Sequence, residues 1–240
     1  AEVVVTGVDL TSWGADLEGA ARLGDLIARV LHEVPELRRL RLSSIDAAEI
    51  DARLLEVFAT ETRLAPHLHL SLQSGDDLIL KRMKRRHSRA QALRLIAEVR
   101  RARPETAFGA DFIAGFPTET EAAFENTLAF VAEAGLAYLH VFPFSPRPGT
   151  PAARMPQTPG GLGQARARRL RAAGEAGLRR HLDHRLGSRA TALVERPGRA
   201  RDADFTEIAF AGEAPPGTLI GGAIARHDGR SARLETWEVQ

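Results

Sequence analysis

The alternation of short apolar strands with amphipathic helices, which runs from residue 2 to residue 142, most constrains how this chain can fold. Five segments show the β-branched or alternating pattern of strands: 2–6, 37–42, 67–72, 106–114 and 138–142. Segments with apolar residues at helical spacing separate them: 23–34, 51–60, 76–83, 88–103 and 121–134. Strands that alternate with helices form a parallel sheet, either open or closed into a barrel, so the predicted fold class is α/β.

Capping residues define several of these helices. Asp76 is placed to cap the helix that ends near Met83, and Ser88 to cap the next helix, which Pro104 stops. Gly135 is placed to end the last helix of the series. Local capping chemistry and the apolar pattern therefore predict the same elements.

Polar and glycine-rich segments follow the predicted strands at their carboxyl ends: 7–9, 43–44, 73–75 and 115–117. In parallel α/β folds the loops after the strands build the active site, so we expect a functional rim here. Four acidic residues lie near these ends: Asp9, Asp46, Asp111 and Glu119. Each could act as a general base, accept from a ribose hydroxyl or bind an amine. A single acid at a strand end more often caps a helix or forms hydrogen bonds within its own loop, and that alternative is favoured here.

The organisation changes at the proline-rich segment 143–151, which predicts an ordered loop or a boundary. A long basic helix is expected over 165–186. Short strands with turn signals then predict a small β-barrel: 190–195, 205–210, 218–226 and 232–235. We therefore divide the chain into an α/β part (1–157), a basic linker helix (158–186) and a β-barrel (187–240).

The net charge of +2 hides two clusters of cationic residues. The first lies within 81–89 and contains no acid, and the second is a series of arginines from Arg166 to Arg189. Because the planar arginine fork suits phosphate, one interpretation is a surface for a polyanion such as nucleic acid. The alternative is a solvated helix face with acids opposite.

Composition excludes several classes of site. The sequence has no cysteine, which excludes disulfides, a cysteine nucleophile and any cysteine-held iron–sulfur cluster within these residues. It also lacks a nucleotide-binding glycine loop and a hydrolase signature, so a hydrolase has no support. His67 and His69 share one strand face, where core packing or a rim position is favoured over a metal; we expect no metal site. No apolar run reaches the about 18 residues of a membrane span, and we expect a cytoplasmic protein.

Three segments resemble the methylthiotransferases of the radical S-adenosylmethionine (SAM) superfamily in order and spacing. They are 70–76 with 80–85 (LSLQSGD, LKRMKR), 111–120 (DFIAGFPTET) and 144–152 (FSPRPGTPA). Segments 42–46 and 67–73 are most similar to the MtaB branch of that family, whose other branches are MiaB and RimO. The tail, 187–236, resembles the TRAM domain, an RNA-binding β-barrel.

The resemblance implies a partial radical SAM barrel, with strands two to six present, followed by a TRAM barrel. In the family, a Cys-x-x-x-Cys-x-x-Cys loop holds a 4Fe–4S cluster that binds SAM, and reductive cleavage gives a 5′-deoxyadenosyl radical. The radical abstracts hydrogen from C2 of a modified adenine, a second 4Fe–4S cluster participates in sulfur insertion, and a second SAM donates the methyl group. The MtaB branch acts on threonylcarbamoyladenosine next to the tRNA anticodon.

The resemblance assigns six residues to SAM binding: Gly7, Asp9, Gln73, Arg85, Asp111 and Gly115. Gly7 would permit close backbone approach, Asp9 would accept from the ammonium group and Arg85 would pair with the carboxylate. Arg147 is expected to position substrate or its own loop. Five arginines are expected to contact tRNA: Arg166, Arg169, Arg179, Arg180 and Arg189.

Both cysteine sets of the family are missing from this sequence, and the resemblance places them, with the first barrel strand, before Ala1. We therefore expect these residues to be the C-terminal part of a longer protein. Alone they should contain no catalytic residue, perform no radical chemistry and bind SAM weakly. The competing hypothesis is that they serve only as an RNA-binding module. The electron donor, the sulfur source and the oligomeric state stay open.

Overall fold

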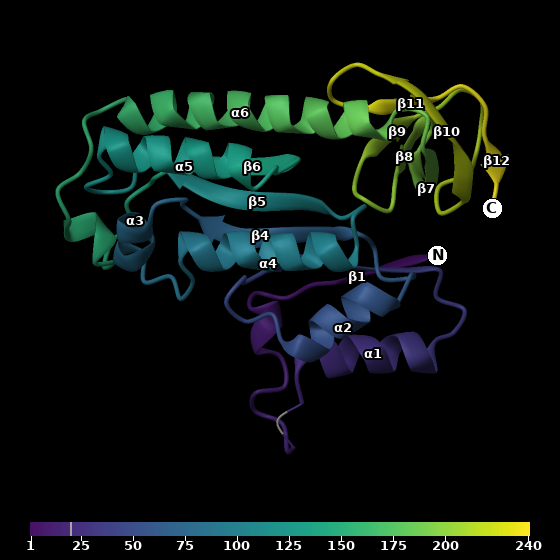
Figure 1. Ribbon diagram of the computed structural model, residues 1–240, viewed down its shortest axis with the longest axis horizontal. Helices are drawn as coiled ribbons and strands as arrows, with labels where there is room; N and C mark the ends of the chain where they lie inside the picture. Colours follow the sequence, from purple (N-terminus) through teal and green to yellow (C-terminus); the bar gives the residue numbers. More distant parts are fainter. Residues whose placement is uncertain (20) are drawn as a thin grey trace.

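The computed structural model describes residues 1–19 and 21–240 as a curved parallel sheet with helices outside it, joined by one long helix to a small β-barrel (Figure 1). The strands of the first part are β1 (Glu2–Val5), β2 (Arg39–Leu42), β3 (Ser44–Ile45), β4 (His67–Gln73), β5 (Ala107–Ala114) and β6 (Tyr138–Pro143). Every pairing among these strands is parallel. The predicted α/β class is therefore confirmed.

The second predicted strand is longer than expected and is divided at Ser43. Its first half, β2, pairs with β1, whereas its second half, β3, pairs with β4. A parallel bridge between Leu40 and Leu64 keeps the two pairings continuous. The five predicted strand positions are thus all present, and the second changes its hydrogen-bonded partner halfway along.

The helices lie close to their predicted ranges: α1 (Leu23–Glu33), α2 (Ala52–Thr60), α3 (Asp77–Arg82), α4 (Arg89–Ala102), α5 (Glu121–Glu133) and α6 (Leu162–Arg185), with short 3-10 turns at Leu10–Ser12 and Ala152–Arg154. The Asp76 side chain accepts from the first backbone N–H groups of α3, and Ser88 forms a capping box with Gln91 at the start of α4. Both predicted caps are confirmed. Among the described helices, none has the length and apolarity needed to cross a membrane.

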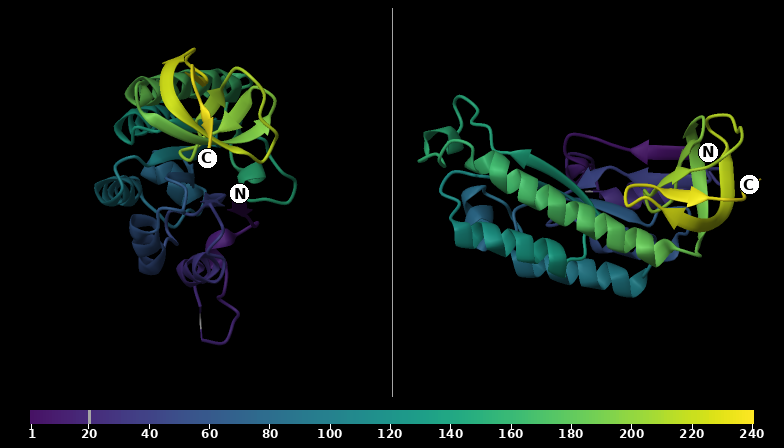
Figure 2. Two further views of the ribbon diagram at one scale, coloured as in Figure 1. Left: turned by 90° about the vertical axis from the view of Figure 1, so that its right-hand side faces the viewer. Right: turned by 90° about the horizontal axis from the view of Figure 1, so that it is seen from above.

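The period-two pattern of β4 separates two faces of the sheet. Leu68, Leu70 and Leu72 are buried in the core beneath the helices. His67 and His69 alternate with them and face the concave side. Figure 2 shows the helices gathered on the outer side of the strands. The inner face carries polar side chains, among them His69, Asp111 and His140.

The helix α6 is more than the predicted linker, because it belongs to two cores. Leu170 packs into the core of the α/β part, and Leu182 into that of the small barrel. Two glycines allow α6 to pack closely on β6 and on the segment that precedes it. A Cβ on Gly174 would lie 3.0 Å from Leu139 Cβ, and a Cβ on Gly177 would lie only 2.2 Å from the backbone oxygen of Leu136.

The small barrel contains β7 (Arg189–Arg196), β8 (Arg199–Arg201), β9 (Glu207–Ala209), β10 (Leu219–His227), β11 (Ala232–Leu234) and β12 (Glu238–Val239). Closure comes from β11, which pairs with both β9 and β10, while β12 adds to the outer side of β10. Four of these strands match the predicted ones. The short β8 and β12 were not predicted, because three or two residues rich in charge carry no apolar pattern.

A loop of the small barrel, residues 202–206, closes the amino-terminal end of the inner face. Arg41 donates to the backbone oxygens of Asp202 and Ala203, each at 3.0 Å, and pairs with Glu2 at 2.9 Å. Phe205, held at a positive φ of 76°, stacks on His67 with ring centroids 4.6 Å apart. These contacts fix the barrel against the strands and leave their carboxyl ends open.

We predict that Gly177→Ala destabilises the chain by about 2 kcal/mol, because the added methyl group collides with a backbone oxygen that cannot move aside. Helix propensity alone would favour alanine by about 1 kcal/mol, so a net loss isolates the packing effect. Urea unfolding followed by circular dichroism measures the change. Gly160→Ala, which adds a methyl group to open space, is the control; equal stability of the two variants would contradict the prediction.

Candidate functional site

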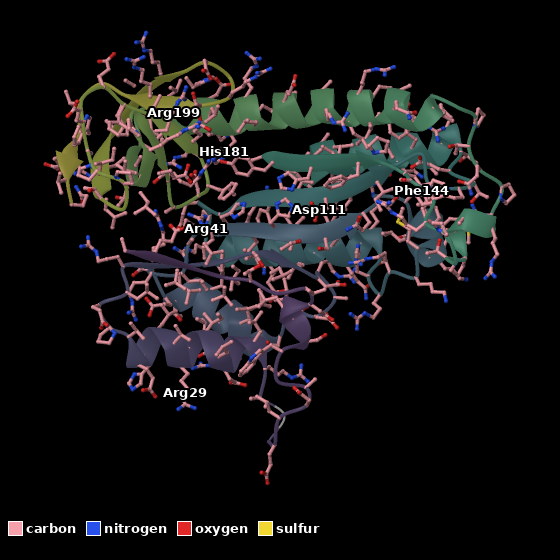
Figure 3. All side chains as sticks on the ribbon, turned by 180° about the vertical axis from the view of Figure 1, so that it is seen from behind. Arg29, Arg41, Asp111, Phe144, His181 and Arg199 are labelled. Carbon is pink, nitrogen blue, oxygen red and sulfur yellow. The ribbon has the colours of Figure 1, made fainter. Side chains whose placement is uncertain are left out.

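Five polar side chains from the four neighbouring strands β3 to β6 meet on the inner face of the sheet. Asp111 Oδ1 lies 3.0 Å from His69 Nε2 and 3.2 Å from His140 Nδ1. Ser44 Oγ lies 3.4 Å from the other carboxylate oxygen and 2.8 Å from Ser71 Oγ. Figure 3 shows Asp111 between Arg41, at the barrel end of the strands, and Phe144 beyond their carboxyl ends. The sheet thus holds a connected polar cluster halfway along its inner face.

Sheet register brings this cluster together. Asp111 and His140 are direct partners on β5 and β6, and His69 is opposite Gly109. A Cβ on Gly109 would lie 2.5 Å from His69 Nδ1, so the glycine leaves the space that the imidazole ring occupies. Burial alone would raise the pKa of the Asp111 carboxyl, but hydrogen bonds and charge from the two histidines outweigh it and hold the pKa below its usual range.

A cavity of about 370 Å³ lies in front of this cluster. His69, Asp111 and His140 form part of its wall, and His67 and Phe205 lie toward its amino-terminal end. Burial lowers the pKa of His67 to about 3, so its ring is neutral at physiological pH. Both His67 nitrogens are buried without a hydrogen-bond partner among the described residues.

A second cavity of about 280 Å³ lies beside the first, and Ser44 contributes to both. Asp9 and Arg85, two of the predicted SAM residues, line it. Arg85 donates to Asp46 Oδ2 at 2.9 Å and to the backbone oxygen of Ser71 at 2.6 Å, while its buried Nε has no partner among the described residues. An exposed carboxylate and a guanidinium with a spare donor fit the two charges of an amino acid group.

The other predicted SAM residues surround the carboxyl ends of the strands. Gln73 ends β4 in the left-handed region, with φ of 68°, and Gly115 follows β5 with φ of 76°. Gly7 lies exposed after β1, near the first of the open loops. Arg147 lies exposed in the proline-rich loop, where its backbone oxygen accepts from Thr150. The structure thus distributes these residues around one rim.

Glu119 is a structural residue, although its position near a strand end left catalytic roles open. Its carboxylate is buried, accepts from the Gly115 N–H at 2.8 Å and pairs with Arg166 at 2.9 Å. Burial raises its pKa despite those two contacts, which lower it. The ion pair therefore ties the loop after β5 to the start of α6.

The predicted RNA-binding arginines divide into paired and free side chains. The prediction that Arg166 contacts RNA is corrected by the structure. Its side chain is only 4% exposed because it forms a buried ion pair with Glu119, so it is not accessible to RNA. Arg169 pairs with Glu121 and Glu125, and Arg189 with Glu238. Arg169 thus fits the alternative stated above, a solvated helix face with acids opposite it.

Arg179 and Arg180 are exposed and form no ion pair with any residue that the structure describes. The guanidinium of Arg179 lies over Gly229, in the turn between β10 and β11. This hairpin adds three exposed arginines that the sequence did not single out: Arg226, Arg230 and Arg233. Arg226 and Arg233 are cross-strand partners. We call these five the arginine patch.

The family model described as the radical SAM superfamily matches residues 2–131, more than half of the chain. The chain belongs to the radical SAM superfamily. The fold agrees: coproporphyrinogen III oxidase from Escherichia coli, described as a radical SAM enzyme, superposes with a TM-score of 0.51 at 16% identity, over 87% of this chain and 55% of that one.

Two curated proteins called threonylcarbamoyladenosine tRNA methylthiotransferase MtaB are similar in sequence. The one from Rickettsia prowazekii is 52% identical over 207 residues, which are 86% of this chain and 49% of that protein. The one from Thermotoga maritima is 42% identical over 64% of this chain and 35% of its own length. A tRNA-2-methylthio-N(6)-dimethylallyladenosine synthase from Cereibacter sphaeroides is 40% identical, over 82% of this chain and 44% of that protein. The predicted resemblance to methylthiotransferases is confirmed, and the chain spans about half the length of these relatives or less.

Sequence reasoning missed His69, His140, Ser44 and Ser71 as members of one cluster. Period-two alternation placed His67 and His69 on one strand face, but the register with β5 and β6 was not available from the pattern. A usable signal was the polar alternation itself, since a strand buried on both faces would be apolar throughout.

We predict that Arg166→Met destabilises the chain by about 3 kcal/mol, because it leaves the buried Glu119 carboxylate without its partner. The folded variant should show the same affinity for tRNA as the parent chain, whatever that affinity is, because the Arg166 side chain is buried. Urea unfolding and fluorescence anisotropy measure the two properties. Arg168→Met, at an exposed neighbouring position, is the control and should change stability by less than about 0.5 kcal/mol. Weaker tRNA binding with unchanged stability would contradict this prediction and would indicate that Arg166 contacts RNA.

Proposed function

We propose that the chain is the SAM-binding and tRNA-binding part of a methylthiotransferase that modifies threonylcarbamoyladenosine next to the tRNA anticodon. The observation that carries this proposal is the 52% identity to an MtaB methylthiotransferase over 86% of the chain. Identity at this level over most of the chain supports a shared substrate. The adenosine itself would enter from the open carboxyl ends of the strands.

In this proposal the rim holds SAM. Arg85 would donate to the carboxylate and Asp9 would accept from the ammonium group, in the cavity that they share. Gly7 and Gly115 would let the backbone approach, and Gln73 would face the ribose. When bound to a 4Fe–4S cluster, SAM supplies a carbon radical, while the residues of this chain orient it and exclude water.

The superfamily implies SAM and one 4Fe–4S cluster, and we propose the second cluster of the methylthiotransferases as well. The chain has no cysteine, so thiolate ligands for either cluster would come from outside these residues. Without the cluster as anchor, we expect these residues to bind SAM weakly and to perform no radical chemistry. We propose a cytoplasmic location for the whole protein, because its relatives are named as tRNA-modifying enzymes.

The small barrel and the end of α6 would hold tRNA. Arg179 and Arg180 have no acidic partner among the described residues, and the hairpin arginines extend the same surface. Because phosphate contacts release counterions, binding through this patch would depend strongly on salt. Arg147, in the exposed loop after β6, would contact substrate near the rim.

A second candidate function is RNA binding alone. It is favoured by the exposed arginine patch together with the absence of cysteine from the sequence. The two candidates differ in the fate of the modified nucleoside, which only the methylthiotransferase would change.

We predict that deleting the gene removes 2-methylthio-threonylcarbamoyladenosine from total tRNA while threonylcarbamoyladenosine remains. Nuclease digestion followed by liquid chromatography and mass spectrometry measures both nucleosides. Complementation with the whole coding sequence should restore the product, whereas these 240 residues should not. Loss of a methylthio group from isopentenyladenosine, or from a ribosomal-protein aspartate, would instead assign the MiaB or RimO branch; no change would support the RNA-binding module.

We also predict that Arg179→Gln with Arg180→Gln weakens tRNA binding and lowers the salt dependence, with the slope of log affinity against log salt falling by about 1 to 2. Anisotropy titrations at several salt concentrations measure the slope. Arg29→Gln, an exposed arginine on α1 far from the small barrel (Figure 3), is the control. An unchanged slope in the double variant would place tRNA elsewhere.

A further inference from the structure

We propose that His69, Asp111 and His140 form a binding site for a divalent transition-metal ion on the inner face of the sheet. The sequence predicted no metal site, because the three residues lie on three strands and have no motif spacing. The proposal rests on their geometry and not on the proposed methylthiotransferase function, although the resemblance also assigns Asp111 to SAM binding.

Two of the three separations between ligand atoms match those found in metal sites. Zinc and its neighbours bind imidazole nitrogen and carboxylate oxygen at about 2.1 Å, so adjacent ligand atoms lie about 3.0 to 3.4 Å apart in octahedral or tetrahedral geometry. The carboxylate oxygen of Asp111 lies 3.0 Å from His69 Nε2 and 3.2 Å from His140 Nδ1. One ligand atom from each of the three residues lies within 4.8 Å of the others. An ion bound here would take the place of the protons that these nitrogens share with the carboxylate.

The surrounding residues hold the ligands in place. Gly109 opens the space in which the His69 ring lies. Ser44 contacts the second oxygen of Asp111 at 3.4 Å, and Ser71 in turn contacts Ser44 at 2.8 Å. Such outer contacts orient the ligands of metal sites, and ligands on strands are held more precisely than ligands on loops.

The site would be open on one side. Side-chain exposure rises from 10% for His69 to 20% for Asp111 and 59% for His140, and all three face the cavity of about 370 Å³. An ion there would keep positions for water or for a polar group of a ligand. His67 lines the same cavity, and neither of its ring nitrogens has a hydrogen-bond partner among the described residues.

The donor set selects the class of ion. Two imidazoles and one carboxylate suit Zn²⁺, Fe²⁺, Co²⁺ or Ni²⁺, whereas Mg²⁺ and Ca²⁺ prefer oxygen ligands. Because the chain has no cysteine, thiolates cannot compete for the ion.

The test uses the tag-free chain, stripped of metal and free of SAM, titrated with Co²⁺ and Zn²⁺. We expect one equivalent of Co²⁺ to give visible d–d absorption that Zn²⁺ displaces, and Zn²⁺ to raise the thermal unfolding temperature. His140→Gln and Asp111→Asn should each weaken binding at least 100-fold. Since the His140 side chain is more than half exposed, His140→Gln should fold like the parent chain.

His32→Gln, at an exposed position on α1, is the matched control and should bind both ions as the parent chain does. The proposal is overturned if no stoichiometric binding occurs, if His140→Gln binds with unchanged affinity, or if Mg²⁺ competes equally with Zn²⁺. Circular dichroism without metal shows whether each variant is folded. The assay contains neither SAM nor tRNA, so its failure would leave the proposed methylthiotransferase function standing.

Discussion

The orientation of the small barrel on the α/β part depends on one buried carboxylate, which holds two arginines against the backbone of the small barrel. Glu2 pairs with Arg39 and Arg41, and burial, which alone would raise the pKa of Glu2, is outweighed by both guanidinium groups. The other guanidinium N–H groups donate to backbone oxygens of the small barrel: Arg39 to that of Thr191 and Arg41 to that of Ala203. Charges this deeply buried tolerate few arrangements, since any other leaves donors unpaired. These contacts hold the small barrel across the amino-terminal end of the inner face.

The second constraint is the helix α6, which supplies apolar residues to both cores. At one end, the ion pair of Arg166 with Glu119 joins it to the loop after β5. At the other, Arg185 pairs with Asp202, and His181 lies 3.0 Å from Asp204 Oδ2. The helix is therefore anchored at both ends, to the loop after β5 and to the 202–206 loop of the small barrel.

The sequence predicted the fold well because each element carries its own signal. Alternation defined β4, and a capping side chain defined the start of α4. Contacts between elements were beyond reach: Asp111 and His140 are 29 positions apart and meet only through the register of β5 with β6. Charge was equally ambiguous, since Arg166 and Arg179 belong to one basic helix, yet the first is buried against an acid and the second is exposed.

Because α6 begins close to the loop after β5, its length sets the distance between that loop and the arginines beside the small barrel. Gly163, near its start, lies against Gly115, whereas Arg179 lies sixteen residues later beside the small barrel. At 1.5 Å per residue this is about 24 Å. An RNA that contacted both places, as the proposed function requires, would have to span that distance. Its backbone contacts and its base contacts would then involve different nucleotides, and substitutions at the two places would change affinity and selectivity separately.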